Sequence, residues 1–387
     1  MIHRIKSTLM GFIESRRKLG VVSLLPKGEI RGVVLLSYLI DPFFKKSNDD
    51  PAFFAHTNMW ECKQMAQTFL DFNYKVDVIN WNNQKFTPKQ KYSFFIDIHS
   101  NLERLVPFLD RDCIRILHIT GAHWLFQNRA EYARLLALQQ RRGITLIPRR
   151  LVLPSLGIEY ADCATTLGNQ FTISTFSYVK KPIYRVPISA SVLYPFPEDK
   201  DYEACRSRFL WFGSSGMVHK GLDLVLEAFA EMPEYHLTVC GPVKNEKDFE
   251  SAFFKELYQT PNIHTIGWID VSSPKFQEIT KNCIGLIYPS CSEGGGGSVV
   301  TCLHAGLIPI VSIESSVDIN DFGITLKDCT VDEIKKSVKI LSGQSVNELK
   351  LRVRKAWEYA RAHHTREQFT LRYEEVVQKI IARYDKH

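Results

Sequence analysis

The chain lacks an uninterrupted apolar run as long as a membrane-spanning helix needs, about 18 residues. Its start also lacks the apolar core and the small-residue cleavage site of a secretion signal. The nine cysteines are scattered along the chain, without the C-x-x-C pairs typical of zinc sites. These absences indicate a cytoplasmic protein with reduced thiols, and they argue against a disulfide framework and a metal site.

Residues 1–30 form a basic amphipathic segment ahead of the first expected strand. Within it, residues 1–20 combine spaced apolar side chains with lysine and arginine, a pattern typical of a helix that lies on an anionic membrane surface. A helix packed on the protein, with its charges in water, fits the same pattern. We therefore expect a cytoplasmic protein that, on the first interpretation, contacts the inner face of the membrane.

The net charge is modest and unevenly distributed. It amounts to +7, and much of the excess lies in the first 18 residues and in the closing third of the chain. No basic stripe is interleaved with aromatic residues, as in many nucleic-acid binding proteins. Nucleic acid is therefore not an expected partner.

Short apolar runs alternate with helical patterns, which predicts two doubly wound α/β domains. A chain of 387 residues is also too long for one ordinary core. We expect a first Rossmann-like domain over residues 31–195, a polar linker between Pro195 and Arg206, and a second such domain over residues 206–362. The runs expected to be strands in the first domain are residues 31–37, 76–79, 94–99 and 114–119, followed by a strand that ends in a turn within residues 160–169. In the second domain they are residues 209–213, 236–241, 263–267, 284–288 and 307–312.

Four consecutive glycines, residues 294–297, lie between an expected strand and a helical pattern over residues 299–305. This arrangement lets the backbone approach a ligand closely and turns free N–H groups at a helix start toward an anion. A flexible linker is the alternative, although linkers rarely separate a buried strand from a helix. Glu293 beside the loop repels phosphate and is better suited to accept from hydroxyl groups. Phosphate and hydroxyl groups together suggest a nucleotide sugar.

A second anion site is expected after the strand at residues 209–213. Lys220 and Gly221 stand at the start of a helix whose apolar residues share one face. A lysine at this place adds a mobile charge to the helix dipole and suits a diphosphate. The spacing differs from a P-loop, because Gly221 and Leu222 follow the lysine, and this disfavours phosphoryl transfer of the kinase type.

The first half of the chain offers weaker candidates. Ligands of doubly wound sheets bind beyond the carboxyl ends of strands, where His123 is expected, although a helix-cap or surface histidine fits as well. His118 lies inside a strand and is expected to be a hydrogen-bonded core histidine. Asn58 is placed in the loop before a helix that starts near Trp60. Arg149 and Arg150 suit an acidic substrate, with surface charge as the alternative.

These segments resemble glycosyltransferase family 4, the retaining enzymes of GT-B fold also described as glycosyl transferases group 1. The likeness rests on residues 212–222, on Gly267 and Trp268, and on residues 289–294 with 305–309. It is specific in the second half of the chain and loose in the first. It implies two Rossmann-like domains that face each other across a cleft. The C-terminal helix, residues 363–387, would cross back to the first domain or, alternatively, cap the second.

The resemblance also implies roles for individual residues. Lys220 would contact the donor diphosphate, Glu293 would bind sugar hydroxyls, and His123 would be the family's histidine near the sugar. His118 is the other candidate for that histidine, and it joins Asn58, Arg149 and Arg150 as an acceptor-side candidate. The donor site as a whole is expected to comprise Gly213, Ser214, Lys220, Glu293, Gly294, Gly295, Gly296, Gly297, Ser298 and Thr301.

Two positions depart from the family's pattern. Ser214 stands where the family usually has an arginine six residues before the lysine, and Thr301 stands where a second glutamate usually holds the ribose. Loss of an ionic hydrogen bond weakens donor binding by about 1.5 to 3 kcal/mol when nothing substitutes. Because Lys220, Glu293 and the glycine loop remain, we favour rebuilt donor contacts over lost activity.

By this resemblance the protein transfers a sugar, with retained configuration, from a nucleoside diphosphate sugar to a hydroxyl of a glycan or lipid-linked acceptor. Neither a cofactor nor a metal is expected. Negative charge grows on the leaving diphosphate, where Lys220 and the helix N-termini could stabilise it. No pair of carboxylates has the spacing of a two-carboxylate hydrolase. Two alternatives stay open, a nucleotide-sugar epimerase on the same architecture and a non-catalytic nucleotide-sugar or glycan binding protein.

Overall fold

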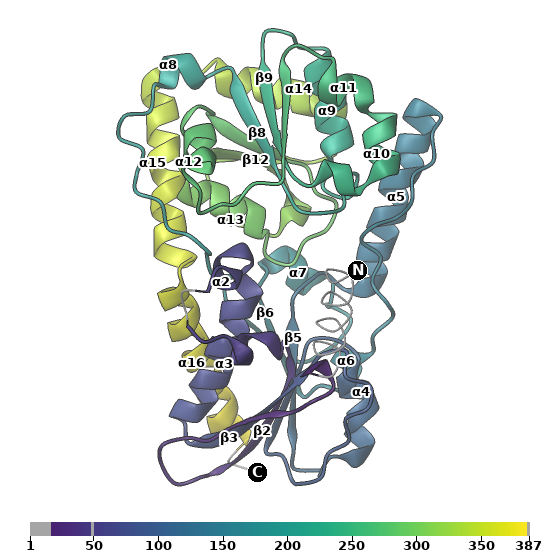
Figure 1. Ribbon diagram of the computed structural model, residues 1–387, viewed down its shortest axis with the longest axis vertical. Helices are drawn as coiled ribbons and strands as arrows, with labels where there is room; N and C mark the ends of the chain where they lie inside the picture. The colour runs from purple at the N-terminus through teal and green to yellow at the C-terminus, as the bar shows by residue number, and fades with distance from the viewer. Residues whose placement is uncertain (1–16, 48–49, 385–387) are drawn as a thin grey trace, which may run out of the picture.

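The computed structural model describes residues 17–47 and 50–384, which form two α/β domains stacked end to end (Figure 1). The first domain lies at the bottom of Figure 1 and the second at the top. Most of the expected membrane-surface segment, residues 1–16, lies outside the described residues. Among the helices that are described, none is long and apolar enough to cross a membrane.

The first domain is built on a sheet that has the order β1-β3-β2-β4-β5-β6-β7 within the described residues. All neighbouring strands are parallel except β1, which pairs antiparallel with β3. The central strands are largely buried and mostly apolar, as expected when helices cover both faces of a parallel sheet. The strands are β1 (Val22–Leu24), β2 (Gly32–Tyr38), β3 (Tyr74–Asn80), β4 (Phe94–Asp97), β5 (Ile114–Ile119), β6 (Cys163–Thr166) and β7 (Ile183–Arg185).

The helices of the first domain include one that begins earlier than expected. The side chain of His56 accepts a hydrogen bond from the backbone N–H of Asn58 and so caps α3. Asn58, expected in a loop, therefore lies in the first turn of α3. The helices are α2 (Ala52–Ala55), α3 (Thr57–Asp71), α4 (Asn101–Leu105), α5 (Trp124–Arg142), α6 (Gly157–Tyr160) and α7 (Gln170–Ser174), with 3-10 turns η1 (Asp41–Phe44) and η2 (Val106–Phe108).

The second domain carries an all-parallel sheet of order β10-β9-β8-β11-β12-β13 in the described part of the chain. The prediction of two doubly wound α/β domains is confirmed. The strands are β8 (Arg208–Phe212), β9 (His236–Cys240), β10 (Ile263–Gly267), β11 (Gly285–Tyr288), β12 (Ile308–Ser312) and β13 (Ile324–Leu326). The helices are α8 (Tyr202–Cys205), α9 (Leu222–Ala230), α10 (Lys247–Ala252), α11 (Phe254–Tyr258), α12 (Pro274–Lys281), α13 (Gly297–His304) and α14 (Val331–Ser342), with 3-10 turns η3 (Val243–Asn245) and η4 (Ile313–Ser315).

The polar stretch expected to be a linker is more ordered than its composition indicates. It contains α8, whose Tyr202 and Cys205 are buried. Lys200 is buried as well, and its Nζ donates to the carbonyl oxygens of Thr280 and Gly306, both 3.1 Å away. This segment is therefore packed on the second domain.

Two long elements run between the domains on opposite sides of the molecule (Figure 1). On one side, α15 (Val346–His363) leads into α16 (Arg366–Tyr384), which packs against α3 of the first domain. Phe369 of α16 meets Trp60 edge to face, with ring centroids 5.8 Å apart. On the other side, α5 reaches the second domain, where Arg141 pairs with Asp223 at 2.6 Å. The space between the domains is thus bounded on both sides.

Candidate functional site

A cavity of about 990 Å³ lies between the two domains. Parallel strands of both sheets end at it, as expected for ligand sites in open α/β sheets. Of the residues expected to act at the site, His118, His123 and Arg149 do not line the cavity. Those that do line it are Asn58, Arg150, Gly213, Ser214, Lys220, Glu293, Gly294, Gly295, Gly296, Gly297, Ser298 and Thr301.

The glycine loop joins β11 to α13, which begins at Gly297 rather than two residues later as expected. Gly295 and Gly296 have φ angles of 148° and 55°, a backbone that other residues rarely adopt. A Cβ at Gly294 would lie 2.1 Å from the carbonyl oxygen of Thr120, so this position touches the first domain. The loop thus combines a close domain contact with free N–H groups at the start of α13.

Lys220 and Glu293 form an ion pair at the cavity wall. The Lys220 Nζ lies 2.5 Å from the Glu293 Oε1 and 2.7 Å from the Tyr288 hydroxyl. The hydroxyls of Tyr288 and Ser290 donate to the same Oε1 at 2.7 and 2.9 Å. Within the described part of the chain no hydrogen bond reaches Oε2, which leaves this oxygen free to accept from a ligand hydroxyl.

The charge state of the pair follows from its surroundings. Burial alone would raise the pKa of the Glu293 carboxyl, but the nearby Lys220, His219 and Arg150 lower it to about 2. Burial lowers the pKa of Lys220, whereas Glu293 acts in the opposite direction. Because an ionised carboxylate lies 2.5 Å away, we assign Lys220 as an ammonium ion. The cavity wall therefore holds a matched pair of opposite charges.

A tight turn delivers Lys220 to this position. Gly221 has a φ of 71°, and a Cβ there would lie 2.6 Å from the carbonyl oxygen of Pro289. The lysine backbone is held by the indole N–H of Trp211, which donates to its carbonyl oxygen at 3.2 Å. The glycine after the lysine is thus required by a close approach of the two loops.

Ser214 and Thr301, the two departures from the family's pattern, both line the cavity. The Thr301 hydroxyl donates to the carbonyl oxygen of Gly297 at 2.8 Å, one turn earlier in α13. Neither side chain is charged. The arginine and the glutamate that the family's pattern has at these two positions therefore have no counterpart there.

His56 is the cavity histidine that sequence reasoning missed. It lies at the junction of α2 and α3 and lines the cavity. Loss of solvation in the cleft lowers the pKa of His56, and the positive charges of Arg150 and Lys220 lower it further. Its Nδ1 accepts from the Asn58 N–H, so the neutral ring carries its proton on Nε2. The only sequence signal was its place before an amphipathic helix that follows the first strand.

The two histidines proposed from the sequence have other environments. His123 caps α5, and its Nε2 lies 3.2 Å from the Tyr178 hydroxyl, outside the cavity. His118 is buried in β5, with its Nδ1 2.8 Å from the Thr165 hydroxyl, and burial lowers its pKa to about 4. Thr120, which lies between the two histidines in the chain, does line the cavity. Its carbonyl oxygen lies so close to Gly294 of the glycine loop that a side chain at that glycine would not fit.

Glu61 of α3 is a second lining residue that sequence reasoning missed. It is fully buried, and its Oε1 accepts from the backbone N–H and the hydroxyl of Ser189 at 2.9 and 2.8 Å. Burial raises its pKa to about 7, although the hydrogen bonds from Ser189 oppose the shift. Glu61 therefore changes charge near neutral pH.

We expect Glu61→Gln to stabilise the protein above pH 7. The folded-state pKa of Glu61 exceeds its ordinary value of 4.5, so the folded state binds the extra proton and the stability of the wild type falls as pH rises from 4.5 to 7. Glutamine avoids this loss, which amounts to about 3 kcal/mol. Chemical denaturation at pH 5 and pH 8 should show the gain at pH 8 only, whereas the exposed control Glu375→Gln should show none. Equal stability of Glu61→Gln and wild type at pH 8 would contradict the assignment.

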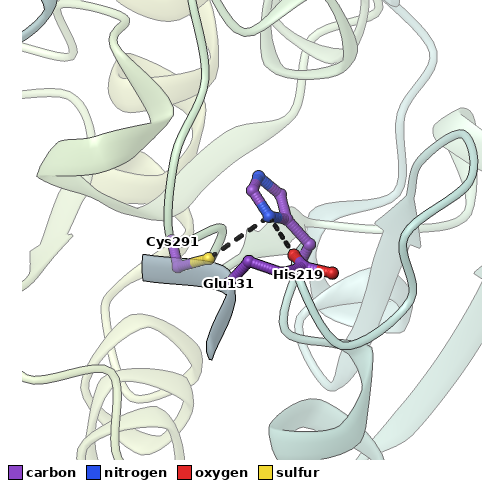
Figure 2. A group of neighbouring side chains, drawn as sticks. All are labelled: Glu131, His219 and Cys291. Carbon is purple, nitrogen blue, oxygen red and sulfur yellow. Dashed lines mark hydrogen bonds and ion pairs between the residues drawn. The ribbon is translucent and has the colours of Figure 1, made fainter. Parts of the chain in front are cut away.

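Glu131, His219 and Cys291 connect the two domains beside the cavity (Figure 2). Glu131 belongs to α5, whereas His219 and Cys291 belong to the two loops that carry Lys220 and the glycines. The His219 Nδ1 lies 2.5 Å from the Glu131 Oε2, and its Nε2 lies 2.7 Å from the carbonyl oxygen of Ser292. Both ring nitrogens thus face acceptors, which favours an imidazolium ion paired with a carboxylate.

These three side chains are also the one group in the described residues with the composition of a metal site. A metal ion lies about 2 Å from each nitrogen or oxygen ligand, which holds the ligand atoms apart. Here nitrogen and oxygen are in direct hydrogen-bond contact. Burial also raises the pKa of the Cys291 thiol to about 12, and a thiol is a poor metal ligand. The arrangement fits a hydrogen-bonded connection between domains better than a chelate.

Comparison with known proteins identifies the fold of the whole chain and gives a sequence match for the second domain. The structure is similar to sucrose-phosphate synthase from Thermosynechococcus elongatus, with a TM-score of 0.61, 12% identity, and coverage of 90% of this chain and 99% of that one. It is also similar to HepE from Anabaena in complex with UDP and glucose, with a TM-score of 0.54, 10% identity, and coverage of 91% and 99%. A third similar structure is WaaG, a glycosyltransferase involved in lipopolysaccharide biosynthesis, with a TM-score of 0.52, 14% identity, and coverage of 90% and 99%.

At the level of sequence the match is confined to the second domain. No curated protein sequence matches the chain significantly. Residues 209–355 match the family model of glycosyl transferases group 1, a range that extends from β8 into α15. The chain thus has the two-domain GT-B fold, and its second domain carries the match to glycosyl transferases group 1.

Proposed function

We propose that the protein transfers a sugar from a nucleoside diphosphate sugar to a hydroxyl of a glycan or lipid-linked acceptor, with retained anomeric configuration. The observation that carries this proposal is the Lys220–Glu293 pair beside the start of α13, in a cavity between two α/β domains. Lys220 suits a diphosphate, and the free Oε2 of Glu293 suits sugar hydroxyls. The match of this domain to glycosyl transferases group 1 supports the same conclusion.

In the proposed reaction, negative charge develops next to groups of the site that can stabilise it. The bond between the anomeric carbon and the diphosphate breaks, the acceptor oxygen attacks from the same face, and the acceptor proton leaves with the diphosphate. Negative charge grows on the leaving group, next to Lys220 and the N–H groups of α13. No cofactor enters this scheme, and the nucleotide sugar is the donor substrate.

The acceptor is proposed to enter along the first domain. The wall on that side combines an aromatic ring and several polar groups, Trp81, His56, Asn58 and Glu61. An aromatic ring suits the apolar face of a sugar unit, and hydrogen-bonding groups suit its hydroxyls. A lipid-linked acceptor would bring the protein to the inner face of the membrane, where residues 1–20 could add a peripheral contact.

The donor is tested by thermal-shift measurements with UDP-, GDP-, ADP-, TDP- and CMP-sugars. UDP-glucose stands first because the similar Anabaena protein binds UDP and glucose. A ligand at a hundred times its dissociation constant stabilises the folded protein by about 2.7 kcal/mol, which is a readily measured shift. We expect one of the nucleoside diphosphate sugars to stabilise the wild type. If none does so, the proposal fails.

The fate of the bound donor separates the proposed transferase from the two alternatives. A transferase consumes the donor and releases nucleoside diphosphate in proportion to the glycosylated acceptor, as measured by coupled assay and mass spectrometry. An epimerase releases a rearranged sugar without any acceptor. A binding protein leaves the donor intact under both conditions.

A further inference from the structure

We infer that Arg150 is a phosphate-binding residue that the first domain contributes to the donor site. The inference rests on the proposed function and adds to it a cation that comes from across the cleft. Arg150 lies between α5 and α6 of the first domain, whereas Lys220 belongs to the second. Both line the same cavity.

The side chain of Arg150 lies directly on the loop between β8 and α9. A Cβ at Gly216 would lie 2.5 Å from the Arg150 Cγ and 2.9 Å from its Cδ. Gly216 has a φ of 92°, which also favours glycine. This loop carries both Ser214 and Lys220. The aliphatic part of the Arg150 side chain therefore packs on the segment that contains Ser214, the position where the expected arginine is missing.

The guanidinium of Arg150 has no acceptor of its own in the described part of the chain. Its Nε is buried without a hydrogen-bond partner. Three neighbouring arginines have acidic partners, Arg141 with Asp223, Arg142 with Glu256, and Arg149 with Asp248, whereas Arg134 of α5 donates to the carbonyl oxygen of Pro289. A buried donor without an acceptor is costly, so a ligand oxygen is the expected partner.

The charges around Arg150 also favour an anion. The acidic residues that line the cavity are Glu61, Asp270 and Glu293. Glu293 is neutralised by Lys220, and Asp270 Oδ1 accepts from the backbone N–H and the hydroxyl of Ser272. Glu61 lies on α3, bonded to Ser189. Among the described residues, the positive charge of Arg150 therefore has no carboxylate partner, and it lies beside helix starts that suit phosphate.

The backbone of Arg150 is held in register with Lys220. Its carbonyl oxygen accepts from the Gln127 side chain at 2.6 Å, and its N–H donates to Glu131 Oε1 at 3.2 Å. The other oxygen of Glu131 binds His219, the residue before Lys220. Arg150 and Lys220 are thus positioned by one connected set of hydrogen bonds. A diphosphate bound between them would link the two domains.

The test compares Arg150→Met with Arg149→Met, a neighbouring arginine that pairs with Asp248 outside the cavity. Methionine keeps an apolar stem against Gly216 and removes the charge. Calorimetry with UDP, ADP, GDP and TDP, and with the corresponding free nucleosides, measures the effect. Loss of a charge-assisted hydrogen bond should weaken binding of the diphosphate by about tenfold or more and leave nucleoside binding unchanged. Arg149→Met should bind as the wild type does.

A second variant restores the charge from the other side of the cleft. Adding Ser214→Arg to Arg150→Met should recover at least part of the lost affinity, because the new guanidinium starts from the same loop that Arg150 covers. Unchanged diphosphate binding by Arg150→Met, or an equal loss for nucleoside and diphosphate, would overturn the inference while the proposed function stands. If the wild type binds none of the four diphosphates, the proposed function fails as well. Melting temperatures without ligand establish that each variant is folded.

Discussion

Lys220→Met should slow sugar transfer by about a hundredfold or more. In the proposed reaction the ammonium group lies where negative charge grows on the leaving diphosphate, and loss of one such donor typically costs a factor of about 10² to 10³. Initial rates at saturating donor isolate this effect from weaker binding. Lys247→Met is the matched control, because Lys247 is an exposed lysine of the same domain that pairs with Glu250. Transfer at the wild-type rate by Lys220→Met would rule out the assigned role.

The same substitution also has a stability effect that must be separated from the catalytic one. Without Lys220 the carboxylate of Glu293 is left nearly buried without its cation, which costs about 3 to 5 kcal/mol. The double variant Lys220→Met/Glu293→Gln removes both charges and should recover most of that stability while remaining inactive. A double variant that is inactive but as unstable as the single one would contradict the ion-pair interpretation.

The ion pair has a further signature in its pH dependence. The pKa of Glu293 is lowered to about 2 in the folded state, below its ordinary value of 4.5. The stabilisation is therefore complete above pH 4.5 and is lost as the pH falls toward 2. Comparison of the wild type with the double variant over this range isolates the contribution of the pair.

Glu131→Ala should destabilise the protein by about 3 kcal/mol or more and weaken donor binding. The carboxylate accepts from the backbone N–H groups of Arg149 and Arg150 and from His219, and burial leaves these donors without water as a substitute. Burial would raise the pKa of Glu131, but these hydrogen bonds outweigh it and lower the pKa. Denaturant unfolding and donor titration measure the two losses.

Glu131→Gln separates the hydrogen bonds from the charge. The amide oxygen can still accept from the two backbone N–H groups, and the amide N–H can donate to a neutral His219 that keeps its proton on Nε2. We therefore expect this variant to retain most of the stability that Glu131→Ala loses. If both variants lose it equally, the ionic pair with His219 is required. If neither loses any, the connection between the domains does not depend on Glu131.

The second domain could be predicted in detail because its features are local. An apolar strand, four glycines and a helical pattern follow one another within about twenty residues, and their order alone places N–H groups at the end of a parallel strand. Lys220, which lines the cavity, was predicted from the sequence in the same way. The helix start at Gly297 was misplaced by two residues, because left-handed glycines can precede a helix or belong to a loop with equal ease.

The first domain's part of the site was harder to predict because its lining residues come from segments that are far apart in the chain. His56, Glu61 and Arg150 meet at one cavity although nearly a hundred positions separate the first from the last. Of the three, only Arg150 was a candidate from the sequence, as one of a pair of arginines; His56 and Glu61 stand in no local pattern that indicates a ligand. His123 does stand in such a pattern, directly after a strand, but the tertiary structure directs its ring toward Tyr178.

The sequence by itself determined the two α/β domains and the loops of the second domain that carry Lys220 and the glycines, since strand, glycine and helix patterns act through the backbone nearby. Only the tertiary structure decided which side chains of the first domain complete the site. That choice depends on how α5 and the loop after it lie on the second domain, where the Glu131–His219 contact and the close approach of Arg150 to Gly216 set the geometry. Contacts between residues so far apart in the chain leave no periodicity for sequence reasoning to detect.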